Sequence, residues 1–292
     1  RKMLSAAALL TVSALLFLST YLLSGDLMLN PFDRSLVFEN LSFAVTDSEG
    51  NSFVIYESMR RIVKLAPDGE VTFVISGGSK ETGKFFYAYE LAVDGDGSLY
   101  VINGVLDDDG FYMQREEIIK YTSSGRFDSV IYSKEYSADE KKPEIVQRVE
   151  FLSLHAGKDS VEWCVVDGVG IHPMRIFTSK GTVERLTSYP LAHANLLVSG
   201  AVRLSDGSIV YSTKRGEIIR TGKKDGEVLY SADGQASPFS IPWWVDADSK
   251  GTVYFSDLGR KSICMIGEVG NVTTVFSREK LEKAGFESGD FV

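Results

Sequence analysis

Short apolar runs alternate with turn-forming residues over most of the chain, and the pattern is clearest between residues 241 and 276. Four runs rich in β-branched and aromatic residues occupy 243–246, 252–256, 262–266 and 272–276. Gly, Asp and Asn separate these runs, and none of them is long enough to form a helix. The stretch therefore predicts four short antiparallel strands in a meander, which is the pattern of one propeller blade.

Earlier parts of the chain repeat this unit. Copies begin near residues 42, 89, 149 and 201, and the third copy diverges most from the others. The turn glycines Gly50 and Gly97 lie 47 positions apart, and Gly207 and Gly251 lie 44 apart. A period of this size is typical of a propeller rather than of a β-sandwich. We therefore predict an all-β propeller of four-stranded antiparallel blades, with five blades visible between residues 41 and 277.

Two of the copies resemble NHL-type repeats. The resemblance rests on residues 93–101 and 248–257 and on the hairpin ends at 65–69 and 121–125. Residues 154–159 depart from it, because they replace the Asp-x-x-Gly turn of the other copies. The resemblance implies little about function, since NHL-like propellers bind proteins, RNA or small molecules and relatives with similar blades are hydrolases or lyases.

Family members usually close with six blades, so the resemblance implies a sixth blade in the parent protein. Its strands would follow Val292, and residues 35–39 would form its outer strand. The chain would then be a fragment truncated at both ends, and a closed ring of five blades is the alternative. Residues 278–292 are interpreted as an inter-blade segment that leads into this further blade, and Ser277 is expected to cap a short helix there.

The N-terminal part of the chain predicts a membrane anchor. Residues 3–25 carry no charge, Arg1 and Lys2 precede them and Asp26 follows. This apolar run is longer than the roughly 20 residues that a helix needs to cross a bilayer. A cleaved signal peptide is the alternative, but no small-x-small cleavage site ends the run. We expect an anchor at 1–25 with its N-terminus in the cytoplasm, a connector at 26–40 and a propeller on the extracytoplasmic side of the cell membrane.

Composition excludes some partners and some chemistry. The net charge of −9 and the lack of a dense basic patch argue against nucleic-acid binding, which requires clustered Lys and Arg. Cys164 and Cys264 lie in equivalent strands of separate copies, farther apart than the roughly 7 Å that a disulfide spans, so we expect two buried free thiols. The three histidines lack metal-ligand spacing. The sequence therefore predicts no resident metal and no cofactor.

Residues that could carry catalysis are few. Asp107–Asp109 suggest a calcium loop, but the spacing fails the EF-hand pattern and predicts a solvated acidic loop. The chain contains no Gly-x-Ser-x-Gly nucleophile elbow. His155 and His172 show no Asp or Ser partner in the sequence pattern. We therefore predict no catalytic residue.

The starts of the innermost strands are the expected binding site, because these strands line the channel of a propeller. Alignment on the turn glycines selects six candidate ligand-binding residues: Phe43, Tyr89, Glu90, Ser199, Trp243 and Trp244. Ser42, Gly200 and, more loosely, Glu150 occupy related positions. Because successive side chains of a strand alternate, we expect one tryptophan to face a ligand and the other to pack between blades. The alternative is that these aromatic side chains only pack.

A mouth rich in aromatic residues with one or two carboxylates suits a sugar, a peptide or another amphipathic ligand. We therefore predict a non-catalytic extracytoplasmic sensor or binding propeller, tethered to the membrane and specific for an unknown small molecule or protein. A lactonase-like propeller hydrolase with a metal in the channel is the alternative from a different class. A scaffold for protein contacts is the third possibility.

Overall fold

The structure is a computed structural model. It describes residues 43–136, 151–191, 198–222, 226–232 and 242–283, except 57, 82, 109, 111, 168, 249, 258, 261 and 268–270. It also describes the backbone of two short strands, β1 (Leu27–Leu29) and β2 (Leu36–Phe38), which pair antiparallel. Residues 35–39 were expected to form the outer strand of a sixth blade, and the structure pairs 36–38 with 27–29.

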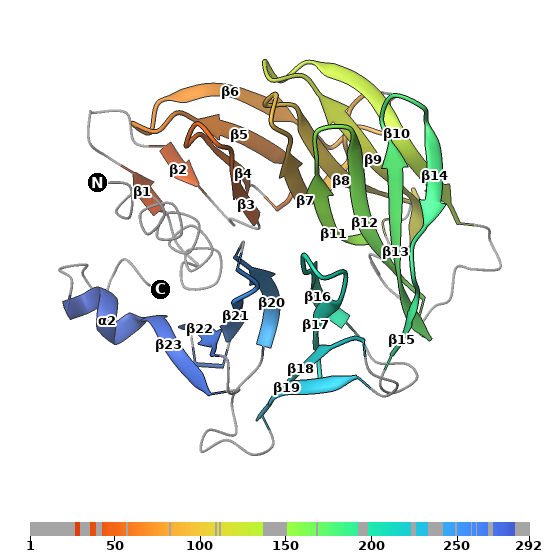
Figure 1. Cartoon of the computed structure of the whole chain (residues 1–292). Coiled ribbons are helices and arrows are strands. Elements are labelled where there is room, and N and C mark those ends of the chain that lie inside the picture. The colour runs from red at the N-terminus through yellow and green to blue at the C-terminus, as the bar shows by residue number, and fades with distance from the viewer. Residues whose placement is uncertain are drawn as a thin grey trace. The chain divides into compact units, whose positions relative to one another are not determined.

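Five antiparallel sheets follow, each a meander in which consecutive strands are neighbours (Figure 1). The first two sheets are built from β3 (Phe43–Thr46), β4 (Ser52–Tyr56), β5 (Arg61–Leu65) and β6 (Val71–Ser76), then β7 (Tyr87–Val93), β8 (Leu99–Leu106), β9 (Met113–Tyr121) and β10 (Phe127–Glu135). The third contains β11 (Phe151–Ala156), β12 (Ser160–Val166), β13 (Gly170–Phe177) and β14 (Thr182–Arg185), and the short β15 (Tyr189–Pro190) pairs with β13.

The last two sheets complete the series. They are built from β16 (Val198–Arg203), β17 (Ile209–Thr213), β18 (Glu217–Arg220) and β19 (Glu227–Ser231), then β20 (Pro242–Ala247), β21 (Val253–Asp257), β22 (Ser262–Ile266) and β23 (Val272–Ser277). A short helix, α2 (Arg278–Lys283), follows β23, and Ser277 Oγ accepts the Lys280 N–H at 3.3 Å. The predicted all-β propeller of four-stranded antiparallel blades is confirmed, with five blades described. The expected helix start at Ser277 is confirmed as well.

Burial explains why the strands differ in sequence pattern. All eight residues of β8 and all five of β4 are buried, because each strand lies inside a sheet that is covered on both faces. Such strands are continuous apolar runs. The outer strand β6 alternates half-buried and exposed residues instead, since only one of its faces is covered. The two kinds of pattern that the sequence shows therefore follow from strand position within a blade.

The chain divides into two compact units. Unit 1 comprises residues 1–163 and 174–184, and unit 2 comprises 164–173 and 185–292. In unit 1, Phe53 and Ile62 of the first blade share a core cluster with Phe85, Leu99 and Ile119 of the second blade region. In unit 2 a second cluster joins the blades β16–β19 and β20–β23: Val210, Ile218, Tyr230, Val245, Phe255 and Cys264. Cys164 and Cys264 are both buried and free, as the sequence predicted.

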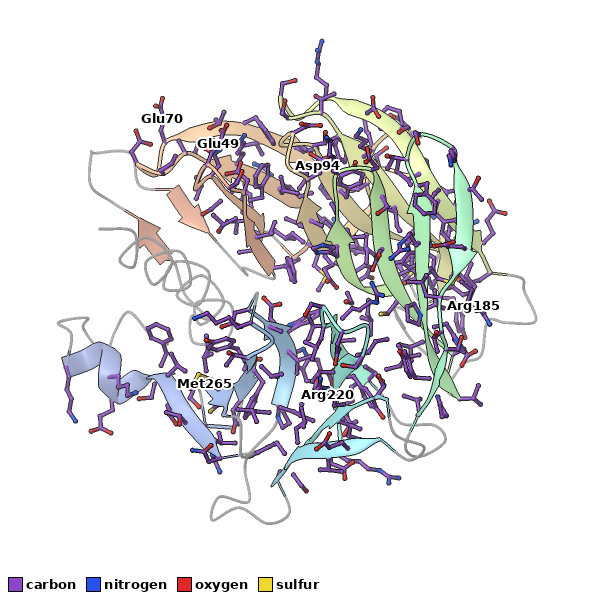
Figure 2. All side chains as sticks on the ribbon, viewed as in Figure 1. Glu49, Glu70, Asp94, Arg185, Arg220 and Met265 are labelled. Carbon is purple, nitrogen blue, oxygen red and sulfur yellow. The ribbon has the colours of Figure 1, made fainter. Side chains whose placement is uncertain are left out.

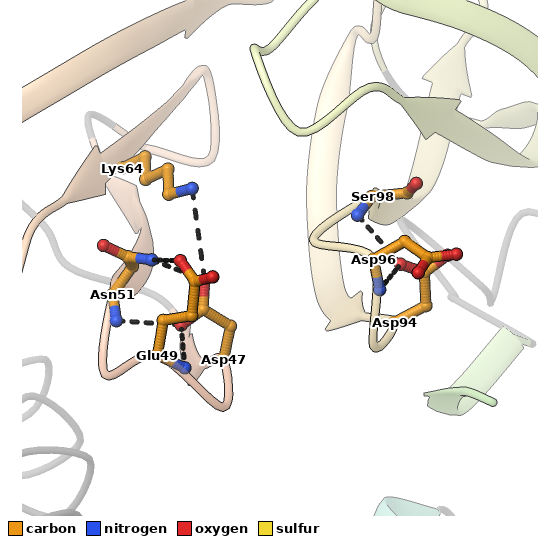
Figure 3. Close-up of polar contacts among 7 residues, drawn as sticks. All are labelled: Asp47, Glu49, Asn51, Lys64, Asp94, Asp96 and Ser98. Carbon is orange, nitrogen blue, oxygen red and sulfur yellow. Dashed lines mark hydrogen bonds and ion pairs between the residues drawn. The ribbon is translucent and has the colours of Figure 1, made fainter. Parts of the chain in front are cut away.

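One aspartate turn recurs at the hairpin between the first and second strand of a blade. Asp94 Oδ1 accepts the N–H groups of Asp96 at 3.0 Å and Ser98 at 2.9 Å, and Asp47 Oδ1 binds Glu49 and Asn51 in the same way (Figure 3). Gly97 has a φ of +78°, which disfavours any residue with a Cβ. Figure 2 shows Asp94 at the end of its hairpin. The Asp-x-x-Gly motif is therefore structural.

Residues 1–26 lie outside the described part of the chain, and so does the predicted anchor. No helix among the described residues is long and apolar enough to span a membrane.

Candidate functional site

Tyr89 stands at a β-bulge in the first strand of its blade. Ala88 pairs with Asn103 and Glu90 pairs with Ile102, which leaves Tyr89 as an extra residue between the two pairs. A bulge of this kind bends the strand and changes the direction of the inserted side chain.

Ser199 occupies the matching position in another blade. Val198 pairs with Thr213 and Gly200 pairs with Ser212, so Ser199 is the extra residue of β16. The side chain of Ser199 is buried, and its hydroxyl has no hydrogen-bond partner among the described residues. An unsatisfied buried hydroxyl is costly, which makes this position unusual.

Trp243 and Trp244 form a third bulge. Both stand opposite Ser256 in the register of β20 and β21, and the Trp244 N–H donates to Ser256 Oγ at 3.1 Å. The expectation that the two rings point to opposite faces assumed strict alternation along the strand. That assumption is wrong here, because the bulge interrupts the alternation. Both tryptophan side chains are half-buried.

Glu90 binds the backbone of the next blade. Its Oε1 accepts the Leu154 N–H at 2.8 Å and its Oε2 accepts the Ser153 N–H at 3.1 Å. Ser153 has a φ of +61°, a strained conformation that turns its N–H and that of Leu154 toward the same carboxylate. These bonds account for the burial of Glu90 without any ligand. Its predicted role in ligand binding stays a prediction.

A second buried carboxylate supports the same strand. Glu116 Oε1 accepts the Phe151 N–H at 3.3 Å, and the Tyr136 hydroxyl donates to Glu116 Oε2. Burial raises the pKa of the Tyr89 phenol, and the nearby Glu116 charge raises it further. A Cβ at Gly104 would lie 2.3 Å from the Tyr89 ring, so this ring packs directly on the backbone of β8.

The other candidates divide between the two units. Phe43 is half-buried and packs on the apolar core of unit 1, next to β7. In unit 2, β16 and β20 are neighbours, and they bring Ser199 together with Trp243 and Trp244. A Cβ at Gly200 would lie 3.1 Å from the Trp243 carbonyl oxygen and from Trp244 Cα. Ser42 and Glu150 lie outside the described residues.

Lys214 is a neighbour of Trp243 that sequence reasoning missed. It follows β17, and its ammonium group lies 5.5 Å from the centroid of the Trp243 ring. Ser212 Oγ donates to the Trp243 carbonyl at 2.5 Å, which ties β20 to β17 beside this contact. The signal that could have found Lys214 is its position at the end of the strand that pairs with β16.

His172 has a partner that the sequence pattern did not reveal. Its Nε2 lies 2.8 Å from Asp167 Oδ2, across the turn between β12 and β13. Burial alone would raise the pKa of the Asp167 carboxyl, but the N–H groups of Val169 and Gly170 together with His172 lower it. The sequence pattern showed no partner for His172, and the structure supplies Asp167.

The acidic groups of the described residues do not converge. No set of three or more His, Cys, Asp or Glu among them is placed to hold a metal ion. In the acidic loop, Asp107 Oδ1 accepts the Tyr112 N–H at 3.3 Å, and Asp108 pairs with Lys80 at 2.7 Å.

No protein-family model matches this chain, and no curated protein sequence matches it. Among solved structures, a chain of the nidogen/laminin complex superposes with a TM-score of 0.57 at 12% identity, covering 84% of this chain and 85% of that one. Virginiamycin B lyase from Staphylococcus aureus superposes with a TM-score of 0.51 at 12% identity, covering 88% of this chain and 76% of that one. A putative 6-phosphogluconolactonase from Bacteroides uniformis superposes with a TM-score of 0.52 at 14% identity, covering 83% of this chain and 73% of that one. At these identities the likeness shows the fold alone, which is that of a β-propeller.

Proposed function

We propose that this chain is a non-catalytic binding propeller, tethered to a membrane and exposed on its extracytoplasmic side. The observation that carries the binding role is the bulged, half-buried Trp243 with the ammonium group of Lys214 beside its ring. Aromatic side chains that keep one face accessible bind ligands through large contact areas at low entropic cost. The bulges at Tyr89 and Ser199 support the same role, since bulges concentrate next to binding sites.

The use of the carboxylates also favours binding over hydrolysis. A lactonase-like site needs carboxylates that are available to a metal or a substrate. Both oxygens of Glu90 accept backbone N–H groups, and Glu116 binds the Phe151 N–H and the Tyr136 hydroxyl. The described bonds of these two acids therefore join neighbouring blades. The resemblance to NHL-type repeats is consistent with a propeller that binds a ligand.

A library screen tests the binding role. The full chain, purified in detergent, is applied to arrays of glycans and peptides beside the Trp243→Ala variant and a matched Lys250→Ala control. We expect at least one ligand whose binding falls in Trp243→Ala and persists in the control. Metal-dependent turnover of a lactone, with no ligand sensitive to Trp243→Ala, would instead establish the hydrolase.

The membrane part of the proposal rests on the uncharged run of residues 3–25 after Arg1 and Lys2. A reporter that is active only outside the cytoplasm, fused after Val292, should be active. The chain should also stay in the membrane fraction at alkaline pH. Activity of a cytoplasmic reporter at the same position would refute this orientation.

A further inference from the structure

The turn between β17 and β18 carries two exposed cations, Lys214 and Arg215. Lys214 and Arg215 form no ion pair with any carboxylate among the described residues of the chain. Three other cations of unit 2 are paired with acids: Arg220 with Asp206, Arg260 with Asp257, and Lys283 with Glu279. In a chain with a net charge of −9, two adjacent exposed cations form a local patch of positive charge. It provides a place where an anion is attracted rather than repelled.

Ser199 adds a hydrogen-bonding group at the same end of the sheet. Val198 pairs with Thr213, the residue before Lys214, so the bulged Ser199 lies beside the cationic turn. Ser199 as a residue is only 8% exposed, and its hydroxyl has no partner among the described residues. A buried hydroxyl that lacks a partner in the free protein gains one if a ligand supplies it, which favours binding.

The aromatic surface beside these groups is held in place. The Ser212 hydroxyl bonds to the Trp243 carbonyl, and the Lys214 ammonium lies against the Trp243 ring. The close approach of Gly200 to Trp244 fixes the distance between β16 and β20. A site whose parts are already positioned loses little entropy on binding.

We infer that Trp243, Lys214, Arg215 and Ser199 form a binding site for an acidic saccharide, a sugar ring that carries a carboxylate or sulfate. The apolar face of the ring stacks on Trp243, the acidic group contacts Lys214 and Arg215, and a sugar hydroxyl bonds to Ser199. This inference rests on the proposed binding function, because it names the ligand class of that same site.

Calorimetry with trigalacturonate and its uncharged analogue galactotriose tests this inference on the full chain in detergent. Trigalacturonate should bind, and its affinity should fall as the salt concentration rises. Galactotriose should bind at least about fivefold more weakly, since it lacks the charged contact.

Three variants and a control separate the contacts. Lys214→Gln and Arg215→Gln should each weaken trigalacturonate binding about fivefold, whereas Lys250→Gln, the same charge change at the opposite end of β20, should not. Ser199→Ala should also weaken binding about fivefold, yet leave the melting temperature equal or higher, because it removes an unsatisfied hydroxyl. If the Ser199 hydroxyl has only a structural role, Ser199→Ala will leave the affinity for trigalacturonate unchanged.

The outcomes distinguish this inference from the proposed function. If trigalacturonate and galactotriose bind equally well and Trp243→Ala weakens the binding of both, the ligand is not an acidic saccharide. The proposed binding function would still hold. Binding of a glutamate tetrapeptide that depends on Lys214, without saccharide binding, would replace the saccharide by an acidic peptide. If wild type binds none of these probes, the inference is wrong, and the array screen alone decides the proposed function.

Discussion

The Oε1 atom of Glu90 lies 2.8 Å from the backbone nitrogen of Leu154, a residue 64 positions later in the chain. This bond joins β7 to β11, the first strands of consecutive blades in unit 1. The strained Ser153, whose N–H binds the other oxygen, makes the contact two-pronged. A side chain selected from the sequence as a ligand-binding candidate thus has a structural task.

Glu90→Ala should lower the free energy of unfolding by about 3 kcal/mol, because it leaves the buried Leu154 N–H and the part-buried Ser153 N–H without an acceptor. Glu90→Gln keeps one acceptor oxygen and should cost less. Urea denaturation of both variants measures this, and Glu70→Ala, at an exposed hairpin end (Figure 2), is the control. Equal stability of Glu90→Ala and Glu70→Ala would show that the bonds to β11 contribute nothing.

Gly200→Ala should destabilise unit 2 by about 1–3 kcal/mol, the usual cost of overpacking. The added methyl group would meet the Trp243 carbonyl, Trp244 Cα and the Trp244 ring, each at 3.1 Å. Backbone atoms cannot move away as a flexible side chain can. Gly95→Ala is the matched control, because a Cβ there meets nothing within 4 Å. Thermal unfolding compares the two, and an unchanged melting temperature for Gly200→Ala would contradict the close packing of β16 on β20.

Asp206 should contribute a pH-dependent increment to stability. The Ser208 hydroxyl and N–H, together with Arg220, lower the pKa of Asp206 to about 2 in the folded chain. A lowered pKa in the folded state gives stability that is complete above the unfolded value of about 4 and is lost as the pH falls toward 2. Since the side chain is half-exposed, solvent screening keeps the increment well below about 1 kcal/mol.

The comparison of wild type with Asp206→Asn measures this increment. The difference in melting temperature should be constant above about pH 5 and should shrink between about pH 4 and pH 2. Arg220→Gln should reduce the difference over the same interval, because it removes one of the groups that stabilise the carboxylate. If the difference in melting temperature between wild type and Asp206→Asn does not change with pH, the ionised Asp206 carboxylate is not its source.

Truncation of Trp163 should cost much more stability than truncation of Trp243. Trp163 is 1% exposed and lies against Tyr132 and Phe151, with ring centroids 4.8 Å and 6.2 Å away. Trp163→Ala should therefore cost about 3–5 kcal/mol of stability. Trp243→Ala, at a half-buried position, should cost about 1 kcal/mol. Chemical denaturation measures both, and a larger loss for Trp243→Ala would show that this ring mainly packs.

The sequence determined the strands and their turns. The apolar runs at 243–246 and 262–266 became β20 and β22, and the Asp94–Gly97 turn formed as expected. It also placed Ser199, Trp243 and Trp244 at equivalent positions of their blades, which the structure shows as bulges. These features depend on residues a few positions apart, whose propensities and hydrogen bonds act within one hairpin.

Only the tertiary structure decided which groups meet. The sequence spacing showed neither the bonds from Glu90 to Ser153 and Leu154 nor the approach of Lys214 to the Trp243 ring. Even the contact between Asp167 and His172 depends on the exact register of one hairpin. Such contacts join residues whose separation in the chain carries no information about their distance in space. They form because packed sheets bring distant strands side by side, and a single inserted residue in a strand then changes which side chains face each other.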